Sequence, residues 1–83
     1  MKALSLYGRP GCHLCAGMRA ELEEFRDELG FSLREFDIDA DPELVARYGT
    51  LIPVLVEGGR EICHYHLDPA ALRRALESSG ETG

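Results

Sequence analysis

The chain has 83 residues, 45% of them hydrophobic and 29% charged, and carries a net charge of −6 at pH 7. It shows no basic stripe, no apolar run near the ~20 residues of a membrane span and no secretory signal, so nucleic-acid and membrane binding are both disfavoured. We expect one small domain that is cytoplasmic and monomeric.

The chain begins with a predicted strand and a predicted helix. Residues 3–7 form an apolar strand, and the apolar spacing that follows predicts a helix from Cys12 or His13 to Leu29. Gly30 is placed to end that helix. The apolar stripe of the helix consists of Leu14, Met18, Leu22, Phe25 and Leu29.

A second strand and a short second helix come next. Residues 31–38 predict a strand whose alternation is imperfect, which a bulge or an edge location would explain. Its inward side chains are expected to be Phe31, Leu33 and Phe36. Asp41 and Pro42 combine a helix cap with a proline at the first helical position. They predict a helix over residues 42–48 that ends at Gly49.

The chain closes with a hairpin and a third helix. A strand over residues 53–56 is followed by a turn with two glycines, which suits a tight hairpin into a strand from Glu61 to His64 or Tyr65. Asp68-Pro69 repeats the cap and proline, and the apolar face of the third helix consists of Leu72, Ala75 and Leu76. Residues 79–83 have nothing to bury, and we expect a disordered tail.

This order of elements, βαβαββα, belongs to the α/β class. The first βαβ unit makes strands one and two parallel, and the hairpin makes the last two strands antiparallel. We therefore expect a four-stranded mixed sheet flanked by three helices over residues 1–78. This is the thioredoxin-like fold in a minimal form.

The chain has three cysteines, of which Cys12 and Cys15 lie where the first strand meets the first helix. The reactive species in disulfide exchange is the thiolate, which a helix N-terminus stabilises through unpaired N–H groups and the helix dipole. Arg9 adds a positive charge nearby. Because the spacing brings both sulfurs to one face of the first turn, we expect Cys12 to attack a target disulfide and Cys15 to resolve the mixed disulfide.

Two other functions stay open on the residues alone. A Cys-x-x-Cys pair can be half of a zinc or iron–sulfur site, for which Cys63, His64 and His66 are the further candidate ligands. The domain is alternatively a non-catalytic interaction platform. No second Cys-x-x-Cys occurs, which favours redox chemistry, and no residue is assigned as a metal ligand.

Several further residues have two interpretations each. Pro53 either simply begins a strand or is a cis proline that faces the Cys pair and leaves the backbone of Ile52 free for an extended thiol substrate. His13 either favours the thiolate when it is protonated or is an exposed residue at the helix start. Cys63 is expected to be a small buried residue of the fourth strand.

The chain resembles the glutaredoxins in two stretches. Residues 7–15, with the sequence YGRPGCHLC, resemble the active-site stretch, and they are most similar to that of short bacterial glutaredoxin-like proteins. Residues 52–55, IPVL, resemble the cis-proline segment of the family. The resemblance spans about residues 3–77.

This resemblance implies a thiol–disulfide oxidoreductase of thioredoxin-like fold, with Cys12 as the nucleophile and Cys15 as the resolving thiol. The candidate substrate-binding residues are Arg9, His13, Ile52 and Pro53. The implied partner is a disulfide-containing protein or a small-molecule thiol. No cofactor is expected to be bound, and glutathione is a candidate co-substrate.

The chain departs from the family after the fourth strand. Glutaredoxins usually carry a Gly-Gly pair there, followed by a polar residue and an aspartate that bind the glutamyl end of glutathione. Residues 63–68 read CHYHLD instead, so bulky side chains replace the glycines and only Asp68 is retained. Dithiol chemistry is therefore the expectation, and the identity of the reductant stays open.

Overall fold

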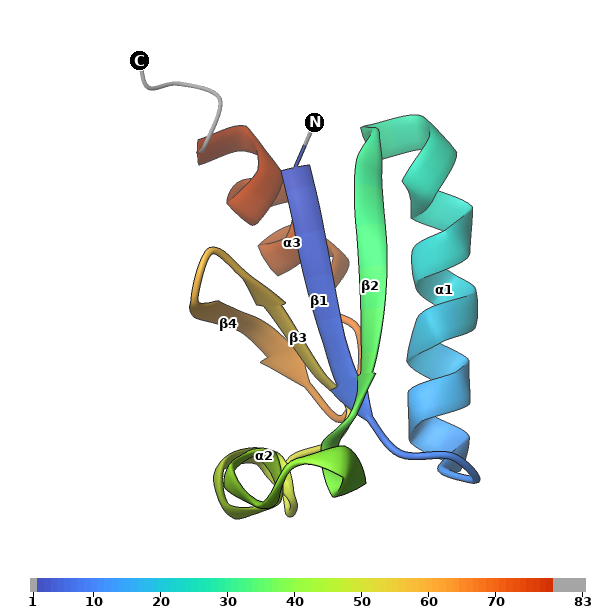
Figure 1. Ribbon diagram of the computed structural model, residues 1–83. Coiled ribbons are helices and arrows are strands. Elements are labelled where there is room, and N and C mark those ends of the chain that lie inside the picture. Colours follow the sequence, from blue (N-terminus) through green and yellow to red (C-terminus); the bar gives the residue numbers. More distant parts are fainter. Residues whose placement is uncertain (1, 79–83) are drawn as a thin grey trace.

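The structure is a computed structural model that describes residues 2–78, so the tail predicted over residues 79–83 lies outside the described residues. The order of elements along the chain is βαβαββα, as predicted (Figure 1). The elements are β1 (Lys2–Gly8), α1 (His13–Leu29), β2 (Phe31–Asp37), the 3₁₀ turn η1 (Ile38–Ala40), α2 (Pro42–Tyr48), β3 (Val54–Glu57), β4 (Arg60–His64) and α3 (Pro69–Ser78).

The four strands form one mixed sheet in the order β2-β1-β3-β4. Strand β1 pairs in parallel with β2 and antiparallel with β3, and β3 pairs antiparallel with β4. The sheet is the predicted one, and β2 lies at its edge. The edge location accounts for the imperfect alternation of β2, because its pairing with β1 runs without a register shift from Lys2 and Phe31 to Gly8 and Asp37.

One hydrophobic core lies between the sheet and helices α1 and α3. Its buried members are Leu4, Leu6, Met18, Leu22, Phe31, Leu55 and Leu72. Met18 and Leu22 come from α1 and Leu72 comes from α3, so both helices cover the same face of the sheet. Figure 1 shows α1 running alongside β2. This packing fixes the start of α1 beside the end of β1.

The predicted apolar stripe of α1 is wrong at its first position. Leu14 is 43% exposed, although it has the same helical spacing as Met18 and Leu22. Leu14 is the second residue of α1, and Figure 1 shows the first turn of this helix extending beyond the ends of β1 and β2. The end of the helix that carries the cysteines is therefore open.

The prediction that Phe36 turns inward is also wrong. Phe36 is 38% exposed, because it has the opposite parity to Phe31 along β2 and so lies on the other face of the sheet. Its ring stacks on Tyr7 at a centroid distance of 5.1 Å, and Tyr7 in turn contacts Tyr48 of α2 at 4.7 Å. Helix α2 therefore covers the second face of the sheet next to the end of β1.

The predicted helix caps are present. The Asp41 carboxylate accepts a hydrogen bond from the N–H of Glu43, and the Asp68 carboxylate accepts one from the N–H of Ala71. Gly30 adopts the left-handed conformation that ends α1 (φ 71°, ψ 55°). Within residues 2–78, no helix combines the length and the apolar character that crossing a bilayer requires.

Candidate functional site

Cys12 occupies the cap position at the start of α1. Its backbone is extended (φ −85°, ψ 118°), and its sulfur accepts a hydrogen bond from the backbone N–H of Cys15 at 3.2 Å. The side chain of a cap residue normally provides an oxygen for this bond. A sulfur therefore takes the place in which the helix offers its unpaired N–H groups.

The surroundings of Cys12 favour its ionised form. Burial works against ionisation, but the Cys15 thiol and the backbone N–H groups of Cys15 and Leu14 hydrogen-bond the sulfur, and Arg9 attracts it electrostatically. Together these contacts hold the pKa of Cys12 below its ordinary value. The hydrogen bonds come from the first turn of α1, as expected for a thiol at a helix N-terminus.

Cys15 has the opposite character. Burial, followed by the hydrogen bond that its thiol donates to Cys12, raises the pKa of Cys15 to about 11. The pair thus combines one thiol that ionises easily with one that keeps its proton. Both cysteines are free thiols in this structure. This difference suits Cys12 to attack first, because the thiolate is the nucleophile in disulfide exchange.

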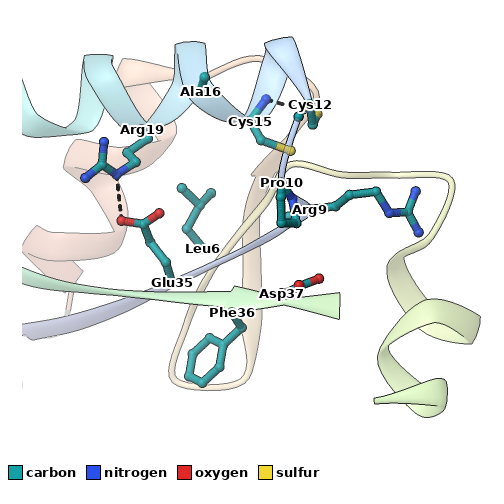
Figure 2. Close-up of a pocket in the computed structure, with 12 residues that line it drawn as sticks. Leu6, Arg9, Pro10, Cys12, Cys15, Ala16, Arg19, Glu35, Phe36 and Asp37 are labelled. Atoms are coloured by element: carbon teal, nitrogen blue, oxygen red, sulfur yellow. Dashed lines mark hydrogen bonds and ion pairs between the residues drawn. The ribbon is translucent and has the colours of Figure 1, made fainter. Parts of the chain in front are cut away.

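Arg9 is held by a carboxylate from another part of the chain. Its guanidinium donates two hydrogen bonds to Asp39, with Nε 3.0 Å from Oδ2 and Nη2 2.9 Å from Oδ1. Figure 2 shows the Arg9 side chain directed away from Cys15. Its attraction is the smallest of the effects on the Cys12 pKa. The expected charge of Arg9 is present, but backbone and thiol hydrogen bonds act more strongly on the sulfur.

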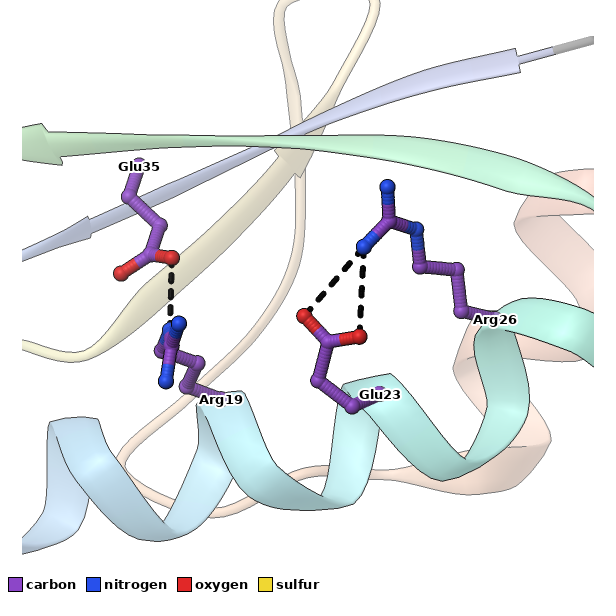
Figure 3. A network of polar contacts seen from close by, with 4 residues as sticks. All are labelled: Arg19, Glu23, Arg26 and Glu35. Carbon is purple, nitrogen blue, oxygen red and sulfur yellow. Dashed lines mark hydrogen bonds and ion pairs between the residues drawn. The ribbon is translucent and has the colours of Figure 1, made fainter.

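A cavity of about 440 Å³ opens beside the two cysteines, between α1 and β2. Figure 2 shows it with Arg9 at one end and the ion pair of Arg19 and Glu35 at the other. That pair joins α1 to β2 with Nε and Oε2 2.7 Å apart, whereas the pair of Arg26 and Glu23 lies within α1 (Figure 3). The cavity is reached by both Cys12 and Cys15, so a ligand there can contact either sulfur.

The Ile52–Pro53 peptide bond is cis, as the resemblance implies. Pro53 is buried and directly precedes β3, whose first residue Val54 pairs with Tyr7. Continuing this register places Pro53 beside Gly8, at the end of the sheet where the Cys pair lies. No residue among those described hydrogen-bonds the backbone N–H or C=O of Ile52. Both groups are available to an extended chain.

Tyr65 is a site residue that the sequence did not indicate. Its φ of 66° lies in the left-handed region, which is unfavourable for a tyrosine. Its hydroxyl donates to the carbonyl of Thr50 at 2.7 Å and its N–H donates to the carbonyl of Pro53 at 2.9 Å. Tyr65 therefore holds both ends of the segment that contains Ile52. The signal that could have revealed it is the glycine pair usual for glutaredoxins here, because glycine adopts positive φ without strain.

The other candidate residues lie apart from this arrangement. His13 is exposed at the first position of α1, and His64 forms a contact with Glu61. Cys63 is half-buried against the core, and burial raises the pKa of its thiol. Among residues 2–78, no group of three histidine, cysteine, aspartate or glutamate side chains is arranged to hold a metal ion.

Residues 3–77 match the family described as Glutaredoxin-like domain (DUF836). The chain is 32% identical over 81 residues to Uncharacterized protein Rv0508 of Mycobacterium tuberculosis, and the match covers 92% of this chain and 84% of that protein. It is also similar to the solution structure of protein Ne2328 from Nitrosomonas europaea. That similarity has a TM-score of 0.84 and 36% identity, over 90% of this chain and 91% of the other.

Thioredoxins share the fold at lower identity. Thioredoxin 1 of Thermosipho africanus is similar with a TM-score of 0.62 over 95% of this chain and 99% of that one, at 15% identity, which shows the fold alone. The fold is thus thioredoxin-like, and the family match together with the Cys pair supports a redox role. On its sequence and its structure, the chain belongs to the glutaredoxin-like domain family.

Proposed function

We propose that this protein reduces disulfides by a dithiol mechanism, with Cys12 as the nucleophile and Cys15 as the resolving thiol. The observation that carries the proposal is the opposite character of the two sulfurs. Cys12 caps α1 with a lowered pKa, whereas Cys15 has a pKa raised to about 11 and donates its thiol proton toward Cys12. Such a pair is suited to attack first with one sulfur and then with the other.

In the first step the Cys12 thiolate attacks one sulfur of the substrate disulfide. A Cys12–substrate bond forms, the substrate S–S bond breaks, and the departing sulfur leaves as a thiolate that takes a proton. In the second step Cys15 loses its proton and attacks the Cys12 sulfur, which releases the other half of the substrate. Two electrons pass from the protein to the substrate, and an external thiol, with glutathione as one candidate, restores the dithiol.

The loop before β3, which contains Ile52 and Pro53, is the substrate-binding segment of this proposal. The unpaired backbone groups of Ile52 lie at the end of the sheet where β1 ends at Gly8, and an extended segment of a protein or thiol substrate can pair with them there. Pro53 orients this segment, Arg9 attracts the sulfur electrostatically, and His13 directly follows Cys12 along the chain. The cytoplasm, where thiol reductants are abundant, is the compartment in which this chemistry runs toward reduction.

Reduction of insulin or of hydroxyethyl disulfide tests the proposal, with reductant supplied either as glutathione or as a dithiol. The parent protein is expected to be active, Cys12→Ser inactive, and Cys15→Ser to accumulate a mixed disulfide at Cys12. Cys63→Ser is the matched control, because that thiol lies in β4 against the core, and it is expected to keep the parent activity. A parent that reduces neither substrate with either reductant contradicts the proposal, and so does an active Cys12→Ser variant.

A further inference from the structure

Gly8 is a buried glycine whose backbone conformation does not require glycine. It is the last residue of β1 and pairs with Asp37 of β2. The described glycines with positive φ are Gly11, Gly30, Gly58 and Gly59. Gly8 is not among them, so any residue can adopt its backbone conformation. The reason for a glycine here must therefore be space.

The space beside Gly8 is filled by Cys15. A Cβ atom added to Gly8 would lie 2.8 Å from the Sγ of Cys15 and 3.2 Å from its Cβ. The first distance is shorter than real Cβ contacts, so the sulfur would have to move. By comparison, a Cβ atom added to Gly17 in α1 meets no atom within 4 Å. Among the described glycines, only Gly8 makes a close approach of this kind to a cysteine.

We propose that Gly8 is a positioning residue, whose missing side chain leaves the space in which the Cys15 sulfur lies ready to attack Cys12. This inference rests on the proposed function, because it assigns to Gly8 the geometry of the resolving step. The Cβ of Cys15 is fixed by the first turn of α1, whereas its Sγ can rotate about χ1. A methyl group at Gly8 therefore turns the sulfur away, while its contact with the Cβ of Cys15 at 3.2 Å requires only a small shift of the helix.

The resolving step is the one that uses this position. The Cys15 thiol gives its proton to solvent, its sulfur bonds to the Cys12 sulfur, and the bond between Cys12 and the substrate breaks. The electron pair of that bond leaves with the substrate sulfur, which takes a proton. The first attack forms a bond to the Cys12 sulfur alone, and Cys15 acts on it only through the pKa of Cys12. The second attack is made by the Cys15 sulfur itself, so displacement of Cys15 affects the second step more than the first.

Single-turnover kinetics of Gly8→Ala test this inference. The mixed disulfide at Cys12 is trapped with acid and measured by mass. The rate of its resolution is expected to fall by about tenfold to a hundredfold, since a misplacement of ~1 Å has effects of this size on reacting groups. The rate at which the mixed disulfide forms is expected to change by less than about threefold, which is ~0.65 kcal/mol. Gly17→Ala is the matched control and is expected to resolve at the parent rate.

A double-mutant cycle of melting temperatures tests the same contact without an activity assay. Gly8→Ala is expected to lower the Tm of the parent, and to lower it less when Cys15 is replaced by alanine, because the clash with Sγ is then absent. A Gly8→Ala variant that unfolds and is rescued by Cys15→Ala also supports the inference. Equal destabilisation in both backgrounds, or resolution at the parent rate, overturns it. If the parent forms no mixed disulfide, the proposed function fails instead, and the double-mutant cycle alone decides whether Gly8 makes room for Cys15.

Discussion

A single atom, the Cys12 sulfur, both caps a helix and lies where chemistry is expected. The N–H of Cys15 that stabilises the start of α1 also stabilises negative charge on this sulfur. Because its pKa is lower in the folded state than in the unfolded state, the Cys12 thiolate stabilises the fold above its unfolded pKa. That stabilisation is lost as the pH falls through the folded value. Folding and reactivity are therefore linked at this residue.

The rate of Cys12 alkylation by iodoacetamide is expected to rise with pH through a midpoint below that of an ordinary cysteine, because the pKa of Cys12 is lowered. Cys15→Ala is expected to move this midpoint upward, because Cys12 then loses the hydrogen bond from the Cys15 thiol. The measurement is the rate at each pH, followed by mass, in a Cys63→Ser background. An identical midpoint with and without the Cys15 thiol would show that this hydrogen bond does not act on Cys12.

The sequence best predicts those helices and strands whose ends are marked by residues within the segment itself. Helix α2 begins and ends where expected, because Asp41, Pro42 and Gly49 mark its limits within the segment itself. The errors at Leu14 and Phe36 have a different origin. Whether an apolar side chain is buried depends on what lies opposite. Neither the position of Leu14 at the start of α1 nor that of Phe36 on the face of the sheet away from the core leaves a mark on the local pattern.

The loop before β3 depends on Tyr65, which reaches it from the end of β4. Tyr65→Phe removes only the hydroxyl that donates to the Thr50 carbonyl, and it is expected to lower the free energy of unfolding by about 0.5–1 kcal/mol. Hydrogen exchange at the amide of Leu51, whose N–H donates to the Tyr48 carbonyl, is expected to become faster, because this end of the segment is released. Exchange at the parent rate would show that the hydroxyl does not hold the loop.

Tyr48→Phe is the control for this substitution. Among residues 2–78 the Tyr48 hydroxyl has no hydrogen-bond partner, and its ring contact with Tyr7 is retained by phenylalanine. It is expected to leave both stability and exchange unchanged. A similar loss in both variants would point to a general effect of removing a tyrosine hydroxyl.

On the scale of the whole molecule, burial against the sheet determines which residues of α1 matter for stability. Leu22→Ala is expected to cost about 2–5 kcal/mol, because Leu22 is fully buried in the core. A domain of this size has about 4–12 kcal/mol of stability in total, so the loss is severe. Leu14→Ala on the same helix is expected to cost less than about 0.5 kcal/mol, because Leu14 is exposed. Urea unfolding of both variants measures the difference, and equal losses would place Leu14 in the core after all.

In the candidate site, short local motifs could be predicted from the sequence, and contacts between residues distant in the sequence could not. The Cys pair and the proline segment are visible in the sequence, because each is a short motif beside a strand. The contacts around them are not, since Asp39 reaches Arg9 from thirty positions away and Tyr65 reaches Thr50 from fifteen. Gly8 meets Cys15 only because α1 packs back beside β1. Such contacts follow from the register of the sheet, which composition and spacing do not determine.

The cap on α1 also bears on the direction in which electrons flow. Each bond that the first turn gives to an anionic sulfur exists in the reduced protein and is weakened once that sulfur enters a disulfide. Stronger hydrogen bonds to the Cys12 thiolate therefore make the Cys12–Cys15 pair more oxidising, as happens when the reduced form of a dithiol protein is stabilised. The rate at which Cys12 attacks and the reducing power of the Cys12–Cys15 pair are thus opposed. A substitution that increases one is expected to decrease the other.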